Sequence, residues 1–226
     1  MQNLREDHGV ETHLRALRYL SIRLKSRPAT ANGAAEVDAA REDVKAKSES
    51  YDEALEQRVA ATAEIEYLDG RLDGTVIGLG RDVLGLVNGD RSDARYLKLF
   101  PVAPTTMMKP VGGDTQATYV SVILDRIADD DDLSTLRNHL KPIRQQLDAL
   151  EKATKARRLL TIAENKAAAD RRLALEDARR VYRLMHPRLL LQFPDDPALV
   201  ESYFAKLSAT RVRDVVAPGD DAPADA

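Results

Sequence analysis

The chain has 226 residues and a net charge of −3, from 34 lysines and arginines against 37 aspartates and glutamates. This balance excludes a polyelectrolyte. Hydrophobic residues make up 43% of the chain, but only 4% of it is aromatic and it has no tryptophan. A core must therefore be built from Leu, Val, Ile and Ala, a composition that favours helices.

The chain contains no cysteine, which excludes disulfides, thiolate zinc sites and cysteine nucleophiles. Its first segment mixes charges of both signs with apolar residues, unlike a secretory signal. The longest apolar runs fall far short of the roughly 20 residues that cross a bilayer. We therefore expect a cytoplasmic protein that does not bind membranes.

The first apolar pattern runs from Leu14 to Leu24. Thr12 precedes it as a candidate N-cap, and Pro28 follows it as a stop. The pattern predicts a helix of about four turns.

A stretch without proline extends from about Ala34 to Val87. Its apolar residues recur almost entirely at steps of three and four, which predicts one face of a long helix. These residues are Val44, Tyr51, Leu55, Val59, Thr62, Ile65, Leu68, Leu72, Val76, Leu79, Val83 and Leu86. Asn88 and Gly89 then supply the left-handed stop that helices favour.

Gly70, Gly74 and Gly78 stand four residues apart near the end of this stretch. On a helix they would line one side and let a second helix approach closely, which is the interpretation we favour. Each glycine costs a helix roughly 1 kcal/mol relative to alanine, so a kinked helix or a short strand over TVIGLG is the alternative.

The second half of the sequence predicts a connector, a short helix and then another long helix. Residues 89–114 are rich in proline and glycine and indicate a connector with at most a short turn at 94–99. A helix is predicted at 115–127, and the acidic run 129–132 reads as a solvated helix start.

A third long stripe has three- and four-residue spacing from Leu133 to Leu150 and continues with wider steps to Met185. It comprises Leu133, Leu136, Leu140, Ile143, Leu147, Leu150, Leu159, Ile162, Leu173, Val181, Leu184 and Met185. Pro142 predicts either a kink or a helix that starts near Lys141, and Pro187 is expected to end the helix. A short helix is predicted at 197–207, and residues 210–226 are expected to form a disordered acidic tail.

One pattern, FPxxP, occurs twice. Its members are Phe100, Pro101 and Pro104 in the first copy and Phe193, Pro194 and Pro197 in the second. Each copy is expected to follow a long helix, with the phenylalanine closing the end of the helical layer while the prolines turn the chain. The pattern suggests an internal duplication of residues 11–104 and 115–197, unless the resemblance is a coincidence between proline-rich loops.

The two long segments differ in charge. Residues 36–73 are predominantly acidic and residues 152–188 predominantly basic, which favours pairing them side by side. The basic segment includes Arg157, Arg158, Arg171, Arg172, Arg179 and Arg180. These six arginines could meet phosphates, although the acidic helix would neutralise the same face.

No catalytic or metal-binding motif is present in the sequence. The four histidines form no HExxH pattern, the acidic run lacks the alternation and glycine of a calcium loop, and no serine occupies a GxSxG elbow. We therefore expect no enzyme, no cofactor and no metal site. A bundle enzyme with a buried cofactor is the third and weakest hypothesis.

Together these patterns predict an all-α protein: an elongated bundle built on two long antiparallel helices, with short helices near the ends. Residues 1–209 are expected to form one domain. The function we expect is a helical scaffold or adaptor that binds a protein partner or itself as a homo-oligomer. Nucleic-acid or anionic-polymer binding through the Arg-rich segment 152–188 is the alternative.

Overall fold

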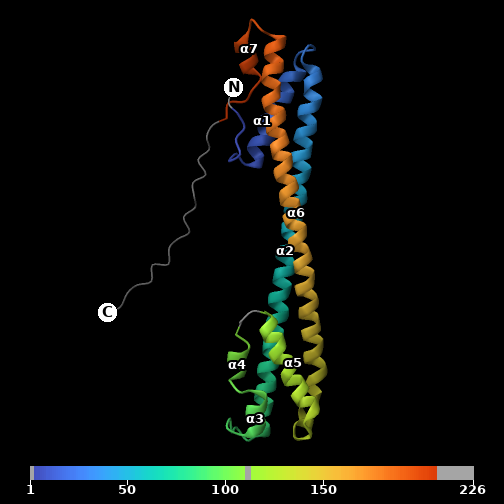
Figure 1. Ribbon diagram of the computed structural model, residues 1–226, viewed down its shortest axis with the longest axis vertical. Coiled ribbons are helices and arrows are strands. Elements are labelled where there is room, and N and C mark those ends of the chain that lie inside the picture. The colour runs from blue at the N-terminus through green and yellow to red at the C-terminus, as the bar shows by residue number, and fades with distance from the viewer. Residues whose placement is uncertain (1–2, 110–112, 208–226) are drawn as a thin grey trace, which may run out of the picture. The chain divides into compact units, whose positions relative to one another are not determined.

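A computed structural model describes residues 3–109 and 113–207 (Figure 1). Within these ranges the regular structure is helical throughout, which confirms the predicted all-α class and its two long helices. The predicted tail at 210–226 lies outside the described residues. The elements are α1 (Val10–Lys25), α2 (Ala31–Leu86), α3 (Ala94–Leu99), α4 (Pro104–Met107), α5 (Gly113–Asp129), the 3-10 helix η1 (Asp131–His139), α6 (Leu140–Gln192) and α7 (Pro197–Ser202).

Helix α2 is continuous over 56 residues, including the glycine-rich stretch that could have formed a strand. It ends where the sequence predicted. Asn88 and Gly89 both have positive φ, 53° and 83°, and the Gly89 amide donates to the Leu84 carbonyl at 2.7 Å. Glycine adopts this conformation without a steric cost, so the stop is encoded locally.

The two prolines of α6 have different effects. Helix α6 begins at Leu140, so Pro142 lies in its first turn, where no N–H is needed, as one of the two predicted alternatives requires. The prediction that Pro187 ends the helix is wrong, because α6 continues to Gln192. The Pro187 ring is exposed, and the next turn is held by Leu189, which is buried, and Leu190, which is partly buried. Burial of that turn offsets the lost hydrogen bond.

Two short boundaries also differ from the predictions. The N-cap of α1 is Gly9, not Thr12. Helix α7 ends at Ser202, five residues before the predicted end. The chain leaves the helix there and buries Tyr203, Phe204 and Leu207, so tertiary burial overrides the local helical preference.

The chain divides into two compact units. Unit 1 comprises residues 1–49 and 170–226, and unit 2 comprises residues 50–169. Both units contain part of α2 and part of α6. The single domain over 1–209 therefore stays a prediction.

The core of unit 1 is formed by α1, the first part of α2, the last part of α6 and the segment that follows α7. Leu17 and Leu20 of α1 are fully buried. Tyr182 of α6 is fully buried as well, and its ring lies edge-on to Phe204 at a centroid distance of 5.2 Å. Aromatic rings are rare in this chain, and Tyr182, Tyr203 and Phe204 all belong to this core.

The core of unit 2 joins the last part of α2 to α3, α4, α5, η1 and the start of α6. Leu72, Leu79 and Leu99 are fully buried. Toward the other end of the unit, α2 and α6 are antiparallel: Arg58 of α2 bonds Glu164 of α6, and Arg157 of α6 bonds Thr62 of α2. From residue 58 to residue 62 of α2, the contacted residue of α6 goes back from 164 to 157, so the two helices run in opposite directions, as the sequence predicted.

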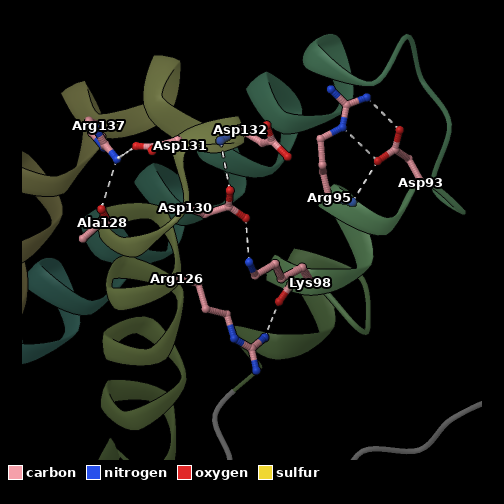
Figure 2. A network of polar contacts seen from close by, with 9 residues as sticks. All are labelled: Asp93, Arg95, Lys98, Arg126, Ala128, Asp130, Asp131, Asp132 and Arg137. Carbon is pink, nitrogen blue, oxygen red and sulfur yellow. Dashed lines mark hydrogen bonds and ion pairs between the residues drawn. The ribbon is translucent and has the colours of Figure 1, made fainter.

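A polar network fixes α3 against the start of η1 in unit 2 (Figure 2). Asp130 is the N-cap of η1: its Oδ1 accepts from the Asp132 amide at 2.9 Å, and its Oδ2 accepts from Lys98 Nζ at 2.6 Å. The hydrogen bond from Lys98 is the main cause that lowers the pKa of Asp130. The acidic run is thus a helix start.

Candidate functional site

The predicted close packing at Gly70, Gly74 and Gly78 is not found. A Cβ atom built at any of the three would meet nothing within 4 Å in the described chain. Four-residue spacing places residues on one side of a helix but does not say whether that side is covered, and here it faces open space.

The close approach falls instead at Gly80, two residues beyond the predicted set. A Cβ atom there would lie 2.5 Å from Pro104 Cγ and 3.8 Å from Phe100 Cε2. Real Cβ contacts are never this short, so only glycine lets the first FPxxP corner settle on α2. The signal was in the sequence as a run of glycines, but the residue that contacts Gly80 is far from it along the chain.

The first corner forms part of the unit 2 core. Phe100 is 1% exposed, and its ring lies 5.8 Å from that of Tyr96. Pro101 is exposed, and Pro104 occupies the first turn of α4. The motif follows the six-residue α3, not a long helix as predicted.

The second corner follows the end of α6, as predicted. Phe193 is half-buried and stacks on Tyr203 at a centroid distance of 6.4 Å, with the guanidinium of Arg27 over its ring. Pro194 is exposed, and Pro197 begins α7. In both corners, therefore, the phenylalanine contacts the core of its unit and the second proline starts a short helix.

The six arginines of the predicted anion-binding face divide between the units. Arg157 and Arg158 are exposed in unit 2, where Arg157 Nε donates to Thr62 Oγ1 at 3.2 Å. In unit 1, Arg171 and Arg179 are half-buried.

The other two arginines, Arg172 and Arg180, form ion pairs on their own helix. Arg172 lies 3.3 Å from Glu176, and Arg180 lies 2.9 Å from Asp177. These intrahelical pairs reduce the positive potential that phosphates would meet.

Exposed leucines are the feature that sequence reasoning missed. The predicted stripe places Leu159, Ile162, Leu173 and Leu184 with the core, yet all four are exposed, whereas Val181 and Met185 are buried as predicted. Within unit 1, Leu173, Leu184 and Leu191 of α6 are 60%, 43% and 86% exposed. Their spacings of 11 and 7 residues are close to whole numbers of helical turns. We call these three residues the leucine face.

The charged residues along the leucine face already have partners. Asp177 and Arg180 pair with each other between Leu173 and Leu184, and Arg188 pairs with Glu36 of α2. Covering the face would therefore not leave these charges without a counter-ion, which is the main cost of burying charged residues.

No protein-family model, curated protein or solved structure matches this chain.

The described residues hold no group of three or more histidines, aspartates or glutamates that could bind a metal ion. His13 is fully buried in unit 1, where its Nδ1 donates to the Gly9 carbonyl at 3.1 Å. His139 and His186 each lie 3.0 Å from a carboxylate, of Asp82 and Glu201 respectively. Across residues 3–109 and 113–207, no helix is long and apolar enough to span a bilayer.

Proposed function

We propose that this chain is a non-enzymatic helical scaffold that associates through the leucine face of α6, first of all with a second copy of itself. The observation that supports the proposal is the exposure of three leucines on one face of a well-packed helix. Single exposed leucines are common on soluble proteins, but a row of them at helical spacing is typical of an interaction surface.

The spacing of the leucines favours a second copy as the partner. A two-fold axis near residue 182 would place Leu173 of one copy opposite Leu191 of the other, and the two Leu184 side chains would flank the axis, each opposite Arg180 of the other copy. Such an interface is isologous, the commonest arrangement in homo-oligomers. The charged residues between the leucines, such as Asp177 and Arg180, already form ion pairs within each copy and would keep them in the interface.

The expected affinity is modest. Burying a leucine contributes up to about 3 kcal/mol, and these side chains are already partly covered. Six leucines from two copies would thus contribute on the order of 10 kcal/mol before the cost of association, which is about 4–15 kcal/mol. Even the smallest of these costs leaves only about 6 kcal/mol, so we expect dimers that dissociate at roughly tens of micromolar or weaker.

Sedimentation velocity over a range of concentrations tests the proposal. The unmodified chain should form dimers as its concentration rises, and Leu184→Lys should keep it monomeric because each new lysine would lie opposite Arg180 of the other copy, where like charges repel. Leu97→Lys is the matched control, since Leu97 is similarly exposed but lies on α3 of unit 2. A chain that stays monomeric at the highest concentration, or a Leu184→Lys variant that dimerises normally, would contradict self-association.

The alternative is anionic-polymer binding through the six arginines. It is supported by the exposed Arg157 and Arg158, and it is weakened by the ion pairs of Arg172 and Arg180. A salt titration of nucleic-acid binding distinguishes it: affinity that falls steeply with salt, and is lost in Arg157→Gln with Arg158→Gln, would favour this function over the scaffold.

A further inference from the structure

An open groove lies in unit 1 between α1 and the segment 201–206. It has a volume of about 950 Å³ and is lined by Arg15, Tyr19 and Arg23 of α1 together with Phe204 and Lys206 from the later segment. This volume is at the upper end of the range for small-molecule sites. The groove is large enough for an extended stretch of chain.

The groove carries an excess of positive charge. Arg15 and Lys206 have no acidic partner in the described part of the chain. Arg23 is partly engaged, since its Nη2 donates to Ser202 Oγ at 2.8 Å and its guanidinium lies over the Tyr203 ring. The one carboxylate in the lining, Glu201, is already hydrogen-bonded to His186 at 3.0 Å. Tyr19 and Phe204 add apolar surface beside these cations. The chemistry suits an acidic segment that also carries small apolar residues.

The chain itself contains such a segment, which begins after the six residues 208–213 that follow Leu207 and include Arg211 and Arg213. Residues 214–226 carry four aspartates, no lysine or arginine, and mostly small residues otherwise: Asp214, Asp220, Asp221 and Asp225 supply the charge. The described chain ends at Leu207, next to Lys206 in the groove lining. At about 3.3–3.6 Å per residue, the residues beyond Leu207 are long enough to turn back along α1.

We propose that the acidic segment 214–226 of this same chain docks in the groove formed by α1 and residues 201–206. Asp220 and Asp221 form ion pairs with Arg15 and Lys206, and the small residues around them lie against Tyr19 and Phe204. Each exposed ion pair contributes little, typically under about 1 kcal/mol. A short connection supplies an effective concentration in the millimolar range, so a weak contact is enough.

Two-dimensional amide NMR spectra of the full chain test the proposal. The unmodified protein is compared with Asp220→Asn, Asp221→Asn and Asp225→Asn combined. Docking predicts shifted amide signals in α1 around Arg15–Arg23 and in residues 201–206, outside the substituted segment. The shifts should largely disappear at about 1 M salt, where the screening length is about 3 Å.

A matched pair of arginine variants locates the contact. Arg15→Gln should move the amide signals of the acidic segment toward their positions in the triple variant. Arg18→Gln should not, because Arg18 is exposed on the same helix but does not line the groove. Lys206→Gln should move the amide signals of the acidic segment in the same direction as Arg15→Gln.

Two results would overturn the proposal. In the first, the triple variant changes only the signals of its own neighbours, which would mean that the segment does not reach the groove. In the second, the α1 shifts grow with protein concentration, which would assign the groove to the acidic segment of another copy. The Leu184→Lys variant distinguishes this proposal from self-association. It should be monomeric, and docking of the acidic segment within one chain should persist in it.

Discussion

The two units are assembled from the same kinds of part but use them differently. Each contains a short helix leading into the start of one long helix, the end of the other long helix, and an FPxxP corner followed by a short helix. In unit 2 the corner phenylalanine, Phe100, is fully buried and the corner rests on Gly80. In unit 1 the equivalent Phe193 is half-buried, and the aromatic core is supplied instead by Tyr182, Tyr203 and Phe204.

This comparison teaches that one short motif can serve two different roles. Each unit also combines parts of both predicted copies, 11–104 and 115–197, because each long helix contributes its start to one unit and its end to the other. An internal duplication would produce this arrangement, and it stays a prediction. The difference in burial between the corners gives direct ways to test the comparison.

The largest effect is expected at the buried corner. Phe100→Ala should lower the free energy of unfolding by about 3–5 kcal/mol, because it removes a fully buried ring and leaves a cavity. Phe193→Ala should cost about half as much, since part of its surface already faces water. Urea unfolding followed by circular dichroism measures both. Equal losses would show that the two corners are energetically equivalent.

The next effect separates Gly80 from the glycines that the sequence singled out. Gly80→Ala should destabilise the protein by about 1–3 kcal/mol, because the new methyl group would overlap Pro104. Gly74→Ala should stabilise it by up to about 1 kcal/mol, because its side is open and alanine is the better helix former. The melting temperatures of both variants, compared with that of the unmodified protein, measure these changes. A stabilised Gly80→Ala variant would contradict the close approach.

The smallest expected effect is a pH dependence confined to unit 1. Burial lowers the pKa of His13 from its ordinary value of 6.5, and the nearby charges of Arg179 and His8 lower it further, against the opposing hydrogen bond to Gly9. The unfolded chain therefore binds a proton that the folded chain does not, so stability is complete above about pH 6.5 and falls as the pH drops through that value. Amide hydrogen exchange in α1 should accelerate at about pH 5 relative to pH 7.5.

His13→Gln provides the control for this effect, since it removes the titrating group. Its α1 amides should lose the acceleration specific to acid pH after correction for intrinsic exchange rates. The amides of unit 2 are an internal reference, because His13 does not contact them. An equal acid response in both units of the unmodified protein would assign the effect to other groups.

Local signals predicted much of the fold. Asn88 and Gly89 end α2 because these two residue types readily adopt positive φ, which depends only on the residues themselves. Pro142 lies in the first turn of α6 because proline fits a helix start, which is also a local property. Pro187 failed as a stop because the burial of Leu189 keeps the helix going, and no local pattern contains that information.

The candidate site was harder to predict because it depends on what covers each face. Three- and four-residue spacing includes both Val181, which is buried, and Leu184, which is exposed. Periodicity identifies apolar positions on a helix but cannot tell a core from an interaction surface when the apolar arc is wide. The same limit explains why Gly80 was missed while Gly70, Gly74 and Gly78 were chosen.

Site-directed cross-linking tests the central claim most directly, because the chain contains no cysteine of its own. Leu184→Cys introduces one thiol at the centre of the leucine face. Mild oxidation should convert this variant to a covalent dimer, whereas Leu97→Cys on unit 2 should remain mostly monomeric under the same conditions. Equal cross-linking at both positions, or none at position 184 at high protein concentration, would contradict the account.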